Sequence, residues 1–246
     1  MHLQIAEQIC VEAQRRNGRL HTLLQQNWPA FYFGSVAPDY QSVCGIPRVQ
    51  THFYDVPPEP DNMGYNYMWQ AYPAVRDVAH LPPEQAMFVA GYSVHLLYDV
   101  IWLRDVVDPF FFRAEGLGER RQRILIHFIL LTYLDKLAVA ALPETAVHTL
   151  AAAHSDKWLP FADNKDLLAW RDLLLPQLEP GAMLSTVAIY AERLKMTPAE
   201  FAASLDDSAW MAANVFGKLP VPEIQAILTT AVPRSVDLLL EFFNLA

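Results

Sequence analysis

The chain has 246 residues, of which 53% are hydrophobic and 18% are charged, and its formal net charge is −9. This composition is typical of a folded protein with a sizeable buried core, and it excludes an intrinsically disordered chain. The acidic balance also excludes broad binding to nucleic acid, because such binding needs many lysine and arginine side chains against the phosphate backbone. Two cysteines are too few for a disulfide framework.

Helix-forming residues are abundant, glycine is scarce, and no segment alternates strictly between apolar and polar residues. These features predict an all-α fold. Thr197-Pro-Ala-Glu200 has the form of a capping box, with Thr197 as the N-cap of a helix. The helices are expected at residues 3–16, 20–27, 65–78, 81–102, 119–141, 144–153, 165–175, 181–194, 199–203, 207–216, 221–230 and 234–244.

A proline-rich segment covers residues 28–61 and contains six prolines. Proline disfavours regular helix, so this segment is expected to be a long irregular loop. A long irregular segment inside a compact domain is often functional. The segment contains Asp39 and His52, which are candidate site residues.

The chain is expected to divide into a metal-binding helical core, residues 1–142, and a C-terminal helical extension, residues 143–246, packed on it. The most apolar run, residues 124–134, has about half of the roughly 20 residues that a membrane span needs. We therefore expect a buried helix there and no transmembrane segment. The first residues show neither a basic region nor an apolar region of a secretory signal, which favours a cytoplasmic location.

His95 and Asp99 lie in an otherwise apolar stretch of the chain. Because they are four residues apart, they share one face of a helix. Gly91, one turn earlier, is expected to leave space beside the imidazole, and Trp102 to wall the site. A buried carboxylate without a partner costs several kcal/mol, so Asp99 requires a cation or a strong local partner. The simpler alternative is a hydrogen bond between His95 and Asp99 within the helix.

Candidate metal ligands gather in the first hundred residues of the chain. Three imidazoles and two carboxylates suit zinc, which accepts nitrogen and oxygen donors in a tetrahedral or five-coordinate shell. A pair of divalent ions would form a positive centre that activates water, and Asp99 is placed to bridge them. The candidate ligands are His2, Asp39, His52, His95 and Asp99.

Three of these positions have alternative interpretations. Asp39 follows a proline, and its alternative role is that of a turn or helix-cap residue. The alternative for His52 is a loop histidine packed against Phe53, and its position in the series of candidate ligands favours a metal ligand. His21 competes with His2 as the early histidine, because terminal residues are often disordered.

The segments Phe33-Gly-Ser-Val-Ala-Pro-Asp39, Thr51-His-Phe53 and 91–102 together resemble the zinc-dependent phospholipase C family. That family shares its helical fold with the fungal single-strand nucleases. In it, zinc is bound by an early histidine, an aspartate in a Gly-x-x-x-Pro-Asp loop, a histidine shortly afterwards and a helical His-x-x-x-Asp pair. The matching positions here are His2, Asp39, His52, His95 and Asp99.

The resemblance implies a zinc-dependent hydrolase that acts on a small phosphoester or a lipid head group. Asp39 would be a ligand or the general base. Full members of the family supply later His and Glu ligands for a further zinc, whereas here His127 is followed four residues on by Leu131. One or two zinc ions are therefore expected, with Asp105, His127 and Asp135 as possible substitutes at a third site. The aromatic residues expected to line the substrate cleft are Trp28, Phe31, Tyr65, Tyr67 and Trp69.

Two other functions remain open from the sequence. One is a non-catalytic helical scaffold that keeps a structural metal, or none, and binds a protein partner through its C-terminal half. The other is a metal-dependent hydrolase of a different ester or an amide. Oligomeric state is not indicated by the sequence.

Overall fold

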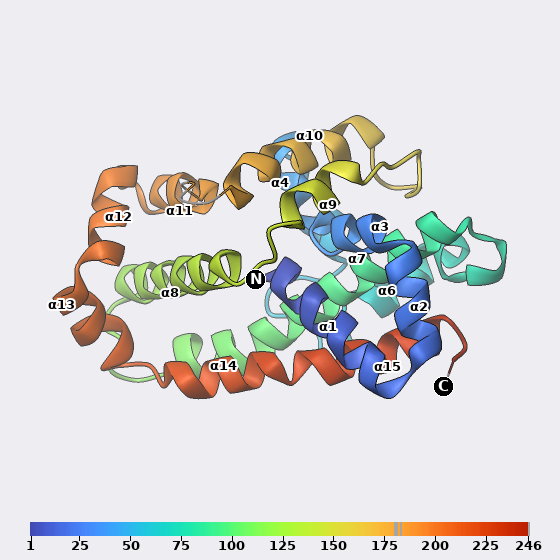
Figure 1. The fold of residues 1–246 in the computed structure, drawn as a ribbon. Coiled ribbons are helices and arrows are strands. Elements are labelled where there is room, and N and C mark those ends of the chain that lie inside the picture. Colours follow the sequence, from blue (N-terminus) through green and yellow to red (C-terminus); the bar gives the residue numbers. More distant parts are fainter. Residues whose placement is uncertain (180–181, 183, 246) are drawn as a thin grey trace.

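The computed structural model describes residues 1–179, 182 and 184–245, and within these residues all regular secondary structure is helical (Figure 1). The predicted all-α fold is confirmed. The α-helices are α1 (His2–Arg16), α2 (Gly18–Gln26), α3 (Trp28–Gly34), α4 (Gln41–Cys44), α5 (Val49–His52), α6 (Tyr65–Ala71), α7 (Pro83–Ile101), α8 (Arg120–Ala140), α9 (Ala146–Ala152), α10 (Asn164–Leu174), α11 (Ser185–Leu194), α12 (Pro198–Asp206), α13 (Ser208–Met211), α14 (Val221–Thr229) and α15 (Ala231–Phe242).

Tighter and wider helical turns connect several of these helices. The expected start of one helix at residue 181 lies outside the described residues, and the described helix α11 begins at Ser185. The 3-10 helices are η1 (Ala37–Tyr40), η2 (Pro73–Arg76), η3 (Val78–His80) and η5 (Leu175–Leu178), and the π-helices are η4 (Trp102–Phe112) and η6 (Ala212–Phe216).

The proline-rich segment is more helical than the sequence predicted. It contains α3, η1, α4 and α5, and only residues 35–36, 45–48 and 53–61 lack regular helix. Pro29 and Pro38 lie in the first turns of α3 and η1, where a helix has no use for the missing N–H group. These two prolines therefore begin helices rather than prevent them.

Helix α7 forms the centre of the fold and packs most extensively against α3. Almost every residue of α7 from Ala86 to Ile101 is buried. Helices α1 and α15 pack on each other and on α7, and α9 packs on α3. The C-terminal helix thus returns to the same core as the N-terminal helix, as Figure 1 shows along its lower edge.

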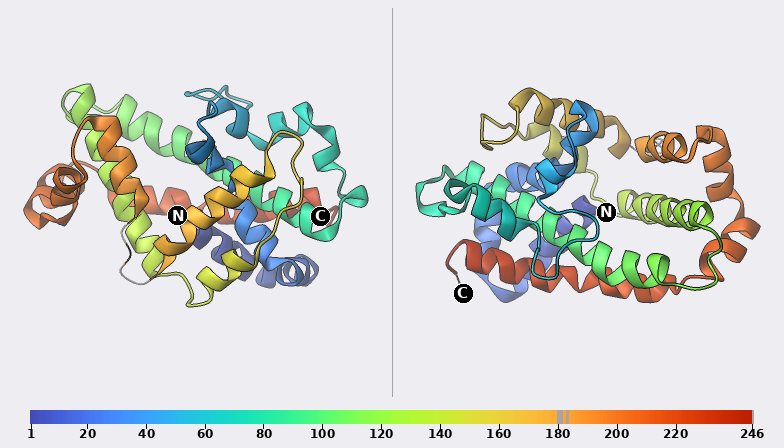
Figure 2. Two further views of the ribbon diagram at one scale, coloured as in Figure 1. Left: turned by 90° about the horizontal axis from the view of Figure 1, so that it is seen from above. Right: turned by 180° about the vertical axis from the view of Figure 1, so that it is seen from behind.

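The later helices extend away from this centre. Helices α11 and α12 pack on α8, while α14 packs along η4, so that α14 and α15 follow the length of the α7–η4 segment (Figure 2). Helix α10 contacts η1, the turn that carries Asp39. The C-terminal helices are therefore packed on the N-terminal ones, and the division at residue 142 itself stays a prediction.

Helices α7 and η4 form one continuous segment, Pro83–Phe112, that is long and apolar enough to cross a membrane by length and composition alone. In the structure, 89% of its most apolar window is buried inside the fold. Burial among other helices is the pattern of a core helix, so this hydrophobicity is already accounted for by packing.

Candidate metal centre

The centre is built on a close crossing of α3 and α7 at two glycines. A Cβ atom at Gly91 would lie 2.3 Å from the carbonyl oxygen of Phe31, and one at Gly34 would lie 2.1 Å from that of Phe88. Only glycine permits such contact between two helix backbones. Gly91 therefore makes room for the backbone of α3. The sequence had predicted instead that it would leave space beside the imidazole of His95.

This crossing places the end of α3 beside His95. The Nδ1 atom of His95 lies 2.9 Å from the main-chain carbonyl oxygen of Ser35, the residue that follows α3. A carbonyl oxygen only accepts hydrogen bonds, so Nδ1 donates and Nε2 of the neutral ring keeps its lone pair. Within the described residues, this fully buried Nε2 has no hydrogen-bond partner.

His52, the last residue of α5, is oriented by its neighbour Thr51. The Thr51 hydroxyl donates to the carbonyl oxygen of Arg48 at 3.1 Å and lies 2.7 Å from Nδ1 of His52. Because its one hydrogen is already used, the hydroxyl accepts the Nδ1 hydrogen of His52. The Nε2 atom of His52 is also buried without a partner in the described part of the chain.

Two carboxylates face these bare nitrogen atoms. Nε2 of His52 lies 3.5 Å from an oxygen of Asp39 and 3.5 Å from Oδ2 of Asp99. Nε2 of His95 lies 3.9 Å from Asp39 and 3.6 Å from Asp99. At 3.6 Å the side chains of His95 and Asp99 do not form the intrahelical hydrogen bond that was the alternative to a metal site.

His2 completes the cluster from the first turn of α1. Its ring stacks on that of His95, with centroids 3.7 Å apart and planes inclined by 11°, and its Nε2 atom lies 3.4 Å from Oδ1 of Asp99. His21, the alternative, lies on α2 and takes no part in the His/Asp groupings found in the described residues.

The five predicted residues form two overlapping groups of three, and within each group the potential ligand atoms lie within 4.8 Å of one another. Two ligands of a tetrahedral zinc ion, each bound at about 2.0–2.1 Å, lie roughly 3.3 Å apart. The separations of 3.4–3.9 Å are close to this value. The donor set and the bare nitrogen atoms therefore fit zinc. The groups are His2, His95, Asp99 and Asp39, His52, His95.

The charges around these residues favour a cation at the centre. Burial lowers the pKa of His2 and of His52, so both imidazoles are neutral donors. Burial tends to raise the pKa of Asp99, but His95 and Arg48 lower it well below its usual value. Burial opposes protonation of His95 too, yet the charge and close contact of the Asp99 carboxylate, the charge of Asp39 and the Ser35 carbonyl together outweigh it and raise that pKa. The same negative charge would attract a metal cation to Nε2.

Sequence reasoning missed two members of the centre, Arg48 and Tyr54. An Arg48 Nη2 hydrogen bond reaches Oδ2 of Asp99, and the same nitrogen donates to the Tyr54 hydroxyl at 2.7 Å. The Tyr54 hydroxyl donates in turn to Oδ2 of Asp99 at 3.2 Å. Arg48 directly precedes α5 and Tyr54 follows it closely. No local sequence pattern indicates that either residue belongs to a metal centre.

The three possible substitute ligands lie outside the two groups. Asp105 pairs with Arg234 at 3.7 Å. His127 accepts a hydrogen bond from the indole N–H of Trp102 at 3.3 Å and is stacked on that ring. Asp135 binds the terminal amine of Met1 at 2.7 Å. Trp102, which was expected to wall the centre, instead packs on His127.

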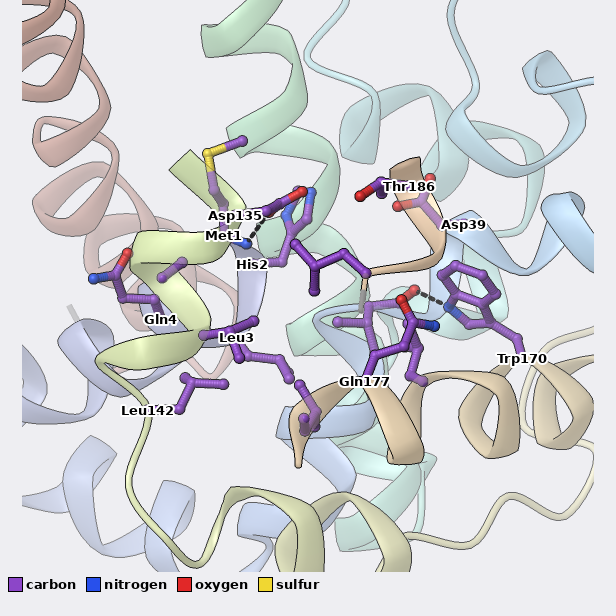
Figure 3. A pocket seen from close by; sticks show the side chains of 16 residues that line it. Met1, His2, Leu3, Gln4, Asp39, Asp135, Leu142, Trp170, Gln177 and Thr186 are labelled. Atoms are coloured by element: carbon purple, nitrogen blue, oxygen red, sulfur yellow. Dashed lines mark hydrogen bonds and ion pairs between the residues drawn. The ribbon is translucent and has the colours of Figure 1, made fainter. Parts of the chain in front are cut away.

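A cavity of about 150 Å³ opens beside the centre. Figure 3 shows Met1, His2 and Asp135 on one side of it, and Asp39 and Trp170 on the other. The aromatic residues expected to line a substrate cleft do not line this cavity, so that lining stays a prediction: Trp28, Phe31, Tyr65, Tyr67 and Trp69. Much of its apolar wall comes from the turn before η1, from α8 and the residues after it, from α10 and η5, and from the residue before α11. These side chains are Val36, Ala138, Val139, Leu142, Trp170, Leu174, Leu178 and Leu184.

Comparison with known proteins gave one family. Residues 1–175 match the family model described as zinc-dependent phospholipase C. The matched region contains all five residues of the two groups, and it extends from α1 to the first residue of η5. Searches of curated proteins and of solved structures found no match. The family match confirms the resemblance inferred from the sequence.

Proposed function

The chain belongs to the zinc-dependent phospholipase C family, and we propose that it is a zinc-dependent hydrolase of phosphoesters. One observation carries the proposal furthest. Two fully buried histidines, His52 and His95, each present a bare Nε2 atom toward two carboxylates. Buried polar atoms without a partner are costly, so a cation between them is the simplest explanation.

Each residue of the centre has a role in this proposal. Zinc would be held by the two overlapping groups of three, His2, His95, Asp99 and Asp39, His52, His95. Thr51 and the Ser35 carbonyl fix the ring orientation and tautomer of the two buried histidines. Bound zinc would supply Lewis acidity, which polarises a phosphoryl oxygen and makes water more acidic.

Asp39 is the best placed carboxylate to contact substrate and water. Its side chain is 36% exposed and lines the cavity, whereas that of Asp99 is 16% exposed. Burial alone would raise the pKa of Asp39, but the adjacent His52 and His95 lower it below its usual value. The ionised carboxylate can therefore orient an attacking water by accepting its hydrogen bond, or bind the metal.

The cavity supports a substrate that carries an apolar portion. Most of its lining side chains are apolar, and Trp170 is held by a hydrogen bond of 2.7 Å from its indole nitrogen to the Val36 carbonyl oxygen. A lipid phosphoester would place its phosphate near Asp39 and its apolar part against this wall. We therefore propose a lipid phosphoester ahead of a fully polar phosphoester.

The test compares wild-type protein with His95→Ala, and uses His80→Ala as the matched control. His80 is 82% exposed and pairs with Asp77 away from the centre. Zinc is measured by plasma mass spectrometry after dialysis. Hydrolysis is measured on phospholipid vesicles, bis(p-nitrophenyl) phosphate and p-nitrophenyl acetate.

We expect zinc in the wild type and in His80→Ala but not in His95→Ala, and hydrolysis of the phosphoesters only where zinc is present. Zinc without any hydrolysis would favour the non-catalytic scaffold. Hydrolysis of the carboxylic ester alone would favour a hydrolase of another class. A wild-type protein that retains no zinc after zinc is supplied would contradict the proposal.

A further inference from the structure

Arg48 lies inside the metal centre, although no metal-binding pattern includes it. Its side chain is 35% exposed, and its carbonyl oxygen accepts the N–H of His52 at 2.9 Å, one helical turn later. The guanidinium donates to Oδ2 of Asp99, the oxygen that faces both His52 and His95. A permanent positive charge therefore already occupies part of the cation-binding side of Asp99.

This contact limits what Asp99 can still bind. A carboxylate has about four lone-pair positions, two on each oxygen. Arg48 and the Tyr54 hydroxyl take both positions on Oδ2. The positions that remain are on Oδ1, which faces His2 at 3.4 Å. Asp99 is therefore not available to bridge two ions through its two oxygens, which was the role expected from the sequence.

His95 imposes a second limit. Both groups of potential ligands include it, but its Nδ1 atom is bonded to the Ser35 carbonyl, so only Nε2 can bind metal. One imidazole nitrogen has one lone pair and binds one ion. Whichever group His95 completes, a second ion would have only two of the five side chains. Zinc sites in proteins ordinarily have three or four protein ligands.

Charge acts in the same direction. With one Zn²⁺ ion, the charges of the metal, the Arg48 guanidinium and the two carboxylates sum to +1. A second Zn²⁺ ion would raise this sum to +3. Like charges in a partly buried site repel strongly, because the effective dielectric constant there is far below that of water. A second ion would meet this repulsion without a full set of ligands.

We propose that Arg48 is a built-in cation that takes the place of a second metal ion and limits this centre to one zinc per chain. The inference rests on the proposed zinc-dependent function. Without the guanidinium, Oδ2 of Asp99 would be free to join Asp39, His52 and His95. His2 and Oδ1 would then be left for a second, more weakly bound ion.

The test measures zinc stoichiometry, independently of activity. Metal-free protein is titrated with zinc in a calorimeter, and the bound metal is counted by plasma mass spectrometry after dialysis. We expect one zinc per chain in the wild type. Arg48→Met, which removes the charge and keeps much of the side-chain length, is expected to bind a second zinc more weakly than the first. Arg48→Lys keeps the charge and is expected to remain at one zinc.

A double variant locates the second ion. Adding His2→Ala to Arg48→Met is expected to restore one zinc per chain, because the second ion depends on His2. Circular dichroism verifies that each variant is folded, and Arg48→Gln replaces Arg48→Met if the latter does not fold.

Each outcome bears on one of the two proposals. Two tightly bound zinc ions in the wild type would overturn the role of Arg48 and leave the zinc-dependent function standing. A single zinc in folded Arg48→Met and Arg48→Gln would also overturn it. No zinc in the wild type would remove the proposed function itself, and with it this inference.

Discussion

His95 on α7 and His127 on α8 occupy similar sequence contexts and have opposite surroundings. Each lies in an apolar helical run. His95 gives one nitrogen to a main-chain carbonyl and presents the other, bare, to two carboxylates. His127 uses its Nε2 to accept the Trp102 indole hydrogen and is surrounded by aromatic rings, including Phe111 and Phe128.

The contrast indicates that the partners of its two ring nitrogens determine what a histidine in an apolar helix does. A nitrogen that faces ionised carboxylates can bind a cation, whereas one that is already paired with an indole serves packing. Both histidines are compatible with a metal site in the sequence, and only the fold separates them. The predictions below test this distinction, beginning with the largest effect.

Replacing the carboxylate that lines the cavity should have the largest effect on catalysis. Asp39→Asn keeps the size of the side chain and removes its charge beside His52 and His95. We expect kcat/KM for a phosphoester to fall by about 10²–10⁴-fold, the usual contribution of a general base. If the variant retains zinc, Asp39 acts as the base. If the variant loses zinc, Asp39 is a metal ligand. Asp105→Asn, at an exposed ion pair with Arg234, should leave kcat/KM unchanged.

The glycine crossing predicts a loss of stability that reaches the metal centre. Gly91→Ala places a methyl group against the Phe31 carbonyl oxygen, and neither helix backbone can move freely. We expect the free energy of unfolding to fall by about 1–3 kcal/mol, as for other overpacked cores. Zinc affinity should also fall, because α3 carries the Ser35 carbonyl. Gly18→Ala, where no atom lies within 4 Å, is the control for urea unfolding; an equal loss there would contradict this account.

The hydroxyl that orients His52 should affect zinc affinity more than folding. Thr51→Val keeps the side-chain shape and removes the acceptor of the Nδ1 hydrogen. Groups that orient a metal ligand typically contribute about 10–100-fold to affinity, so we expect a loss of that size in a competition titration. Thr51→Ser retains the hydroxyl and should bind zinc nearly as the wild type does. Unchanged affinity in Thr51→Val would show that the tautomer of His52 is fixed in another way.

His127 should reveal its role through the pH dependence of stability. Burial lowers its pKa from the ordinary 6.5 to about 4. As the pH falls from 6.5 toward 4, the unfolded chain takes up a proton at this position and the folded chain does not, so stability decreases. His127→Phe removes this contribution. We expect the difference in Tm between pH 7 and pH 4.5 to be a few degrees smaller in the variant, with zinc content unchanged.

The sequence predicted much of the fold and the members of the centre. Apolar spacing located the long helices, and the predicted capping box forms between Thr197 and Glu200. The five proposed ligands lie together in the structure. The sequence could indicate one pair of them directly, because the spacing of His95 and Asp99 places both on one face of a helix. That they bind metal stays a prediction until zinc is measured.

The errors arise where the outcome depends on contacts between distant segments. Pro29 is compatible with the first turn of a helix, but that a short helix forms there depends on its packing against α7. Arg48 and Tyr54 reach Asp99 across 51 and 45 positions in the chain, through the conformation of the loop around α5. The effect of Gly91 likewise depends on which helix crosses α7 at that point.

The acceptor that orients His95 belongs to the main chain at Ser35 and not to a side chain. Its position is set by the crossing of α3 and α7, so substitutions at residue 35 that preserve the crossing leave the acceptor in place. The Ser35 hydroxyl bonds separately, to the Phe31 carbonyl oxygen at 2.8 Å. The orientation of His95 therefore tolerates substitution of residue 35. The orientation of His52 depends on the Thr51 hydroxyl, so a single substitution that removes this hydroxyl would abolish it.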